Sequence, residues 1–129
     1  MAEVALTGVD HRAKRRVILG QLRPANTTAA SLYIPPANVI GTVECVHVCN
    51  TTGTAATYRL FIHNTGVTYD ETTALEFDKS CPANNSAQHT FPPNGLPMAN
   101  DAGNIAVRTG TANALTFTAW GYELVGAEI

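Results

Sequence analysis

The sequence from Val39 to Leu124 consists of short β-branched and aromatic runs separated by turns rich in Thr, Asn and Gly. The clearest stretch is Val43–Asn64, where VECVHVCN and AATYRLFIHN flank the four-residue segment TTGT, which contains Gly53. Two such runs around a glycine-containing turn predict a β-hairpin. A chain built in this way is typical of proteins that act through their shape and surface rather than through a catalytic group of side chains.

The rest of the chain continues the same pattern, with about seven or eight strands and no helix. Strands are predicted at Val17–Leu22, Ser31–Ile34, Val39–Asn50, Ala55–Asn64, Ala74–Ser80, Ile105–Thr109 and Ala114–Leu124, the last two forming a second hairpin. Cys81–Gln88 and Pro92–Gly103 are expected to be loops, and Leu96–Asp101 has room for one helical turn. The pattern predicts an all-β fold, an antiparallel β-sandwich or jelly roll. We expect a single domain over residues 17–129, preceded by an extended N-terminal arm, residues 1–16.

Charge is scarce and unevenly distributed. Charged residues are 14% of the chain, whereas about a quarter is usual. Residues 1–23 hold five basic and two acidic side chains, a net +3, and residues 24–129 hold three basic and eight acidic ones, a net −5. A basic arm on an acidic body predicts docking of Arg12, Lys14, Arg15 and Arg16 on another protein or on a neighbouring copy. Nucleic acid is the less favoured partner, because no aromatic residues interleave the basic cluster.

The location of the protein is also constrained by the sequence. No apolar run approaches the ~20 residues that a membrane-spanning helix needs, so we expect no membrane partner. The segment MAEVALTGVD lacks the order of a signal peptide, because its acidic residues come first. We therefore expect synthesis in the cytoplasm. Three cysteines are an odd number, which argues against a disulfide framework.

Cys45, His47 and Cys49 alternate along one predicted strand, so their side chains share one face. With His63, Cys81 and His89 they are candidate ligands of a transition metal. A zinc site needs four ligands that converge on one ion, and alternate residues on a strand lie ~6.6 Å apart. We favour the interpretation that the two thiols fill the sandwich core beside a hydrogen-bonded histidine.

The acidic residues Asp70, Glu71, Glu76 and Asp78 raise the question of a calcium site or an acid/base pair. They lack the spacing of an EF-hand loop, and nothing in the sequence places two of them across a cleft. The sequence also lacks the G-x-S-x-G motif of serine hydrolases and the phosphate-binding glycine loop. We therefore expect no enzyme activity, no catalytic or metal-binding residues and no cofactor.

Aromatic residues offer one further possibility. Trp120 and Tyr122 lie on one face of the last predicted strand and, with Tyr69 in a loop, are candidates for stacking on a sugar. An aromatic pair on one strand face is more often part of a core, and that is the interpretation we favour.

Two segments, HVCNTTGTAATYRLFIHN and GLPMANDAGNIAVRTGTANALTFTAWGYEL, together resemble small β-sandwich proteins encoded among the structural genes of tailed bacteriophages. The shared features are the strand ending in Cys49-Asn50, the turn with Gly53, the run Ala55–Leu60, and the closing Trp120–Glu123. The resemblance covers about residues 17–124 and does not include the basic arm. It implies a virion component without catalytic residues.

The sequence and the resemblance together predict a capsid decoration, or cement, protein that works as a homotrimer on the major capsid protein or another virion protein. Two alternatives stay open at this point. One is a tail, neck or fibre-associated virion protein. The other is a carbohydrate-binding β-sandwich module.

Overall fold

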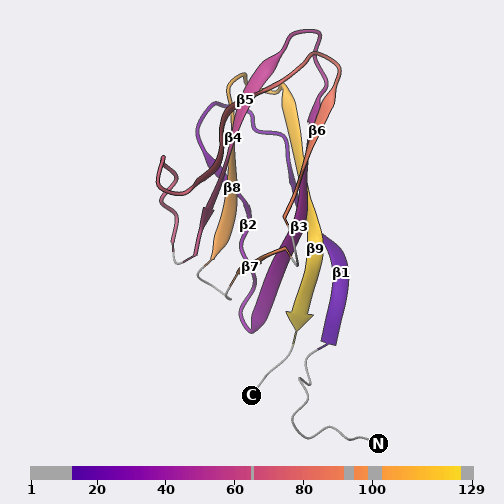
Figure 1. Cartoon of the computed structure of the whole chain (residues 1–129), viewed down its shortest axis with the longest axis vertical. Coiled ribbons are helices and arrows are strands. Elements are labelled where there is room, and N and C mark those ends of the chain that lie inside the picture. The colour runs from indigo at the N-terminus through magenta and orange to yellow at the C-terminus, as the bar shows by residue number, and fades with distance from the viewer. Residues whose placement is uncertain (1–12, 65, 92–94, 99–102, 126–129) are drawn as a thin grey trace, which may run out of the picture.

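The computed structural model describes residues 13–64, 66–91, 95–98 and 103–125. All regular structure in these residues is β, as the sequence predicts (Figure 1). The strands are β1 (Ala13–Leu22), β2 (Ala30–Tyr33), β3 (Val39–Asn50), β4 (Ala56–His63), β5 (Ala74–Cys81), β6 (Ser86–Thr90), β7 (Leu96–Met98), β8 (Asn104–Thr109) and β9 (Leu115–Val125). Within the described residues there is no helix with the length and apolar character needed to cross a membrane.

The strands pair in a nested, antiparallel order. β1 pairs with β9, β2 with β8, β3 with β6, and β4 with β5. The same pairs would form in one long hairpin that had been rolled up. The two sheets are completed because β3 also pairs with β9, and β4 with β8. Sheet A has the order β1-β9-β3-β6, with β7 also on β3, and sheet B has the order β2-β8-β4-β5. Leaving β7 aside, eight strands in two packed sheets with this order form a jelly roll.

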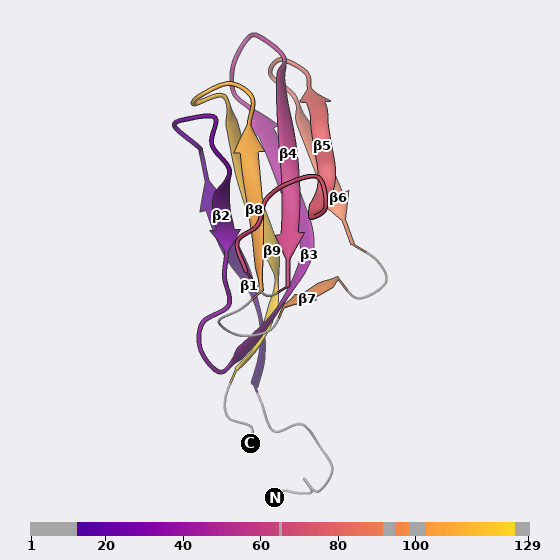
Figure 2. The ribbon, with the colours of Figure 1, turned by 90° about the vertical axis from the view of Figure 1, so that its left-hand side faces the viewer.

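The two predicted hairpins are wrong. β3 and β4 belong to different sheets, and so do β8 and β9, so each turn arches from one layer to the other (Figure 2). Asn50 holds the first arch: its buried side chain donates to the carbonyls of Thr54 and Cys81 at 2.9 and 3.0 Å. Its Oδ1 accepts from the backbone N–H of Thr52 at 2.9 Å. Alternation of apolar residues separates the two faces of a strand, but it does not show which strand lies beside it.

Three segment boundaries also differ from the sequence prediction. β1 begins at Ala13 rather than Val17, because Ala13 to Arg16 continue the backbone pairing with β9. β6 occupies part of the expected loop Cys81–Gln88, where it extends sheet A beside β3. Leu96–Met98 forms strand β7 on β3 rather than a helical turn. In each case an available partner strand decides the conformation, as is common for β-structure.

The core lies between the middle strands of the two sheets. Val43, Val46 and Val48 on β3 are fully buried and face Tyr58 and Leu60 on β4. Phe117, Ala119 and Leu115 on β9 and Ile105 and Val107 on β8 complete the same cluster. Each buried aliphatic or aromatic side chain of this size contributes roughly 1.5–3 kcal/mol. The core therefore fixes the two sheets and leaves their outer faces and side edges available for function.

Candidate functional site

The basic residues predicted to dock lie on β1, at one side edge of sheet A. Lys14, Arg15 and Arg16 occupy successive positions on this strand, so Arg15 projects to one face and its two neighbours to the other. We call these three residues the basic strand. Arg12, the fourth candidate, lies outside the described residues.

Arg15 reaches a buried carboxylate between the sheets. Its Nη2 and Nε donate to Glu123 Oε1 of β9 at 2.9 and 3.2 Å, and the Tyr33 hydroxyl of β2 donates to Glu123 Oε2 at 2.6 Å. The Glu123 side chain is 8% exposed, whereas that of Arg15 is 57% exposed. Burial and the neighbouring Glu123 carboxylate raise the pKa of Tyr33. We call Tyr33, Glu123 and Arg15 the Glu123 network.

The Tyr33 side chain can reach Glu123 because residue 41, against which its ring lies, is a glycine. The Tyr33 ring lies against Gly41 of β3, and a Cβ at Gly41 would collide with the ring. Only a residue without a side chain leaves room for the tyrosine to reach Glu123.

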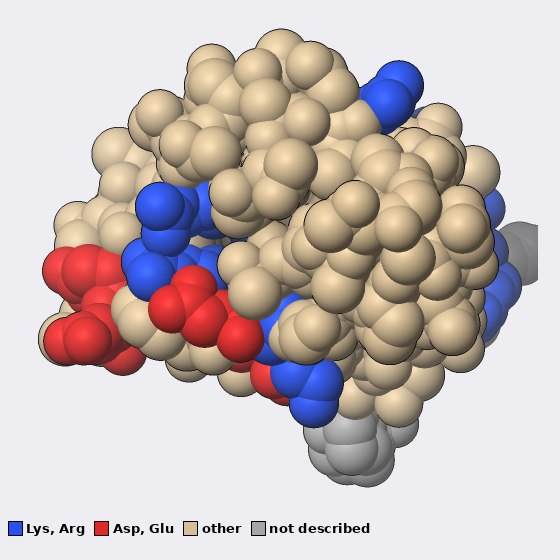
Figure 3. Space-filling view, turned by 90° about the horizontal axis from the view of Figure 1, so that it is seen from above, with Lys and Arg blue, Asp and Glu red and all other residues tan. Residues whose placement is uncertain are grey.

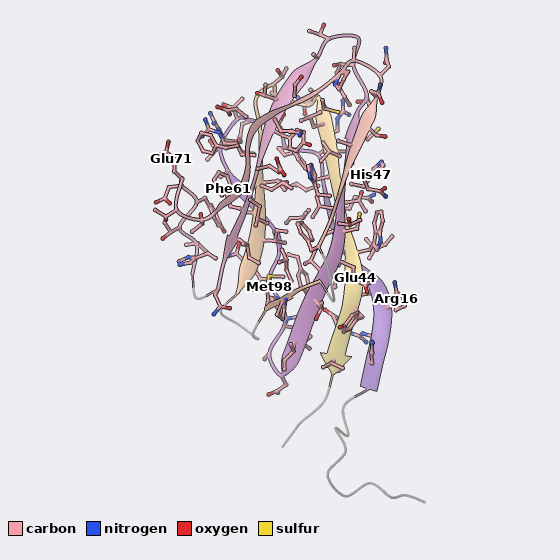
Figure 4. All side chains as sticks on the ribbon, viewed as in Figure 1. Arg16, Glu44, His47, Phe61, Glu71 and Met98 are labelled. Carbon is pink, nitrogen blue, oxygen red and sulfur yellow. The ribbon has the colours of Figure 1, made fainter. Side chains whose placement is uncertain are left out.

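Lys14 and Arg16 project from the outer face of sheet A. Arg16 Nη2 donates to Glu44 Oε1 at 2.7 Å, in a mostly exposed pair. Lys14 Nζ lies 4.1 Å from the centroid of the Tyr122 ring. These contacts position the side chains (Figure 4), and a role in docking stays a prediction.

Cys45, His47 and Cys49 do share one strand face, but it is the outer face of sheet A and not the core between the sheets. The prediction that both thiols are buried in the core holds for the burial of Cys45, but Cys45 is not part of the cluster between the sheets, and Cys49 is only half-buried. Cys45 is buried beside Trp120, its partner on β9, and burial raises the pKa of its thiol. An aromatic residue on the outer face can bury a thiol there, and the alternation alone does not distinguish the two faces.

The other candidate metal ligands are dispersed. His63 Nδ1 accepts the backbone N–H of Thr68 at 3.1 Å, Cys81 is in the core, and His89 lies on β6. Among the described residues, no three His, Cys, Asp or Glu side chains are grouped so that they could hold a metal ion. The three cysteines are free.

His89 forms a network that the sequence did not reveal. The Tyr58 hydroxyl lies 2.5 Å from His89 Nε2, and His89 Nδ1 lies 3.5 Å from Glu76 Oε2. In the tautomer with the proton on Nδ1, toward the Glu76 carboxylate, Nε2 accepts from the Tyr58 hydroxyl. Burial raises the pKa of Tyr58 to about 12 and lowers that of His89. We call these residues the His89 network.

The three members of the His89 network come from β4, β5 and β6, which meet at the side edge of the sandwich opposite β1. No spacing in the sequence marks such a group, because the members are brought together only by the packing of the two sheets.

The aromatic pair Trp120 and Tyr122 is also on the outer face of sheet A, so its predicted place in the core is wrong. Both side chains are half-buried. Trp120 stacks with His47 across the sheet, with ring centroids 6.3 Å apart. Ile18, the β1 partner of Trp120, is 66% exposed beside it. Together they make a partly apolar surface on β1, β9 and β3.

A hollow of about 450 Å³ lies on the outer side of sheet B. Arg59, Tyr69, Asp70, Glu71, Thr72 and Phe77 line it. The Arg59 guanidinium lies 3.8 Å from the centroid of the Phe77 ring and donates to Asp78 Oδ1 at 2.7 Å. The Arg59 bond lowers the pKa of Asp78, and bonds from Thr72 lower that of Asp70. Figure 3 shows the red side chains gathered in one region with blue ones among them, while further blue side chains lie apart on an otherwise largely uncharged surface.

No family model matches the chain, and no curated protein sequence matches it. One similar solved structure is described as that of infectious bursal disease virus, Gx strain, with 13% sequence identity and a TM-score of 0.37. The match covers 90% of this chain and 42% of that chain, so this chain spans less than half the length of the protein it matches.

Proposed function

We propose that this chain is a non-enzymatic structural protein of a virion, a decoration or cement protein that binds the head lattice of a tailed bacteriophage and stabilises it. The observation that carries this proposal is the strand order of the two sheets, which is that of a jelly roll. Jelly rolls recur in viral capsid and lectin domains. The same fold also serves unrelated functions, so the surface has to supply the rest of the argument.

The segments that resemble phage structural proteins support the same function. They include the end of β3 and the strands β4, β7, β8 and β9, of which β3, β4, β8 and β9 are the middle strands of the two sheets. The resemblance therefore extends over the part of the chain that builds the core.

The structure is suited to a passive mechanical role. Its two sheets are joined through the core and also by the Glu123 network at one side edge and the His89 network at the other. A stiff module of this kind stabilises a lattice when many copies each make modest contacts, because repeated contacts add avidity. We expect a homotrimer at three-fold lattice positions on the major capsid protein or another virion protein.

The test uses purified heads of the source virus from which the protein has been removed. Adding the protein back is expected to raise the temperature at which the heads release their contents, with saturation at a fixed ratio to the capsid protein. A variant without residues 1–12 keeps β1, and it should bind the heads more weakly if Arg12 docks there. Saturation at only a few copies per particle would instead indicate a tail, neck or fibre position.

A second candidate function rests on the outer face of sheet A. Trp120 is half-buried there, beside the exposed Ile18 and stacked with His47, in an arrangement that can hold a sugar ring. A glycan-binding screen of the wild type and of Trp120→Ala separates this candidate from the first. Binding that the substitution abolishes would favour a carbohydrate-binding module.

A further inference from the structure

The charges of the described residues are segregated to two sides of the sandwich. Three of the seven described basic residues make up the basic strand on β1. Four of the six described acidic residues lie within residues 70–78, which end on β5; they are Asp70, Glu71, Glu76 and Asp78. We call these four residues the acidic segment. The jelly-roll order places β1 and β5 at opposite side edges, and Figure 4 shows Arg16 and Glu71 on opposite sides of the molecule.

The basic side also has an open strand edge. β1 pairs with β9 along one edge, and no strand of the described residues pairs with its other edge. Such an edge presents backbone N–H and C=O groups that can bind a partner. Ile18, 66% exposed, adds an apolar contact at the middle of the strand.

The acidic side offers a complementary surface. Asp70, Glu71 and Phe77 line the hollow on sheet B, and Phe77 is 42% exposed. The hollow and the adjoining Asp78 hold three carboxylates and one cation, Arg59, a surplus of two negative charges. An exposed aromatic ring beside carboxylates can bind a lysine or arginine side chain. The apolar methylene groups of such a side chain pack on the ring, and its charged end lies near the carboxylates.

We propose that copies of this chain associate head to tail, with the basic strand of one copy on the hollow and acidic segment of the next. The two surfaces are complementary in charge and lie on opposite sides of the same molecule, so each copy can make both contacts at once. Head-to-tail contacts of this kind close into rings when the rotation between copies permits. The association needs no other virion protein, and it does not depend on the function proposed above.

The test is a charge exchange between the two surfaces. Lys14→Glu puts a negative charge on the basic strand, and Glu71→Lys puts a positive charge at the hollow. Each single variant is expected to weaken self-association of the full-length protein about tenfold, because it places like charges opposite each other. The double variant restores opposite charges and should recover most of the lost affinity. Sedimentation velocity across a concentration series measures the association, and circular dichroism confirms that each variant folds.

Arg23→Glu is the matched control, because it changes the net charge by as much as Lys14→Glu does, but outside the basic strand. Arg23 lies after β1 and donates to the carbonyl of Asn113 at 2.6 Å, away from the hollow. Arg23→Glu should leave self-association within twofold of the wild type. Wild-type association should also weaken at high salt, since salt screens charges that are exposed before binding.

Three results would overturn the proposal. The first is a wild-type protein that stays monomeric at micromolar concentration and low salt. The second is association that neither single variant changes. The third is a double variant that associates as weakly as the two single variants combined.

Discussion

Two hydrogen-bonded networks join the sheets, one at each side of the sandwich, and they use different chemistry. In the Glu123 network a buried carboxylate accepts from the Tyr33 hydroxyl at 2.6 Å and from Arg15 at 2.9 Å. In the His89 network the Tyr58 hydroxyl meets an imidazole at 2.5 Å, and the carboxylate of Glu76 stands 3.5 Å away on the far side of the ring.

The difference lies in what each tyrosine binds. The acceptor of Tyr33 is a carboxylate, and hydrogen bonds to charged groups contribute about 1.5–3 kcal/mol, against about 0.5–1.5 kcal/mol for neutral pairs. The acceptor of Tyr58 is a histidine whose pKa burial lowers from the ordinary value of 6.5. We infer that the β1 side of the sandwich is held by the stronger bond and that the β6 side is held by one that acid weakens.

The largest expected effect comes from removing the shared acceptor of the Glu123 network. Glu123→Ala leaves the Tyr33 hydroxyl buried without its partner and Arg15 without its carboxylate. A buried donor left without its acceptor costs about 1–3 kcal/mol, and the Arg15 contact is lost as well, so we expect a loss of about 3 kcal/mol. Urea denaturation of wild type and variant measures it. A loss below about 1 kcal/mol would show that the network contributes little.

The two tyrosines allow a direct comparison with matched substitutions. Tyr33→Phe and Tyr58→Phe each remove one buried hydroxyl and keep the ring. We expect the free energy of unfolding to fall by about 2 kcal/mol for Tyr33→Phe and by about 1 kcal/mol for Tyr58→Phe, because only the first loses a charged acceptor. The same urea titration ranks them, and equal losses would contradict the proposed difference.

The pH dependence of stability separates the two networks. Well above pH 6.5 His89 is neutral in the folded and in the unfolded chain. As the pH falls below 6.5 the unfolded chain takes up the proton first, because the folded pKa is lowered, so the free energy of unfolding decreases until the pH passes the folded pKa. We expect a loss on the order of 1 kcal/mol between pH 7.5 and 5.5.

The control for this experiment is His89→Gln, which keeps a polar side chain that does not titrate in this range. The variant should lose the part of the pH dependence that His89 causes, while the contributions of the other titrating groups remain. A variant whose stability falls with acid as steeply as the wild type would assign the dependence to other residues.

The smallest expected effect is that of Arg15→Ala. Only the Glu123 end of this ion pair is buried: the Arg15 guanidinium is more than half exposed and water can solvate it, and Glu123 keeps its bond from Tyr33, so the pair is expected to contribute little more than the about 0–1 kcal/mol of surface pairs. We expect a loss below 1 kcal/mol with Tyr33 still bound to Glu123. A loss as large as that of Glu123→Ala would mean that the arginine, and not the tyrosine, makes the main contribution to this network.

The sequence predicted the strands better than their arrangement. Val39–Asn50 matches β3 at both ends, because its apolar alternation and flanking turns are local signals. The placement of β3 and β4 in different sheets was not predictable in the same way, since it depends on an arch held by the buried side chain of Asn50. A turn with Gly53 is compatible with a hairpin and with an arch.

The candidate site was predicted only in part. The segregation of charge is visible in the sequence, because Lys14, Arg15 and Arg16 are consecutive. The inward direction of Arg15 was not predicted, since the strand was expected to begin at Val17. The outer position of Trp120 and Tyr122 was missed because the alternation on β9 identifies two faces without identifying the inner one. The His89 network joins residues 58, 76 and 89, and only the packing of the sheets brings them together.

The nested pairing of the strands also sets the order in which the protein can fold. β1, near the start of the chain, pairs with β9, near its end, and β3 pairs with β9 on the other side. Until residues 115–125 have left the ribosome, sheet A lacks the strand between β1 and β3, and the apolar faces of both strands stay exposed. Sheet A can therefore be completed only after residues 13–125 have all been synthesised. Such long-range pairing is slow, since loop closure over many residues precedes the contacts that stabilise it. The newly made chain is therefore prone to aggregate until β9 has inserted between β1 and β3.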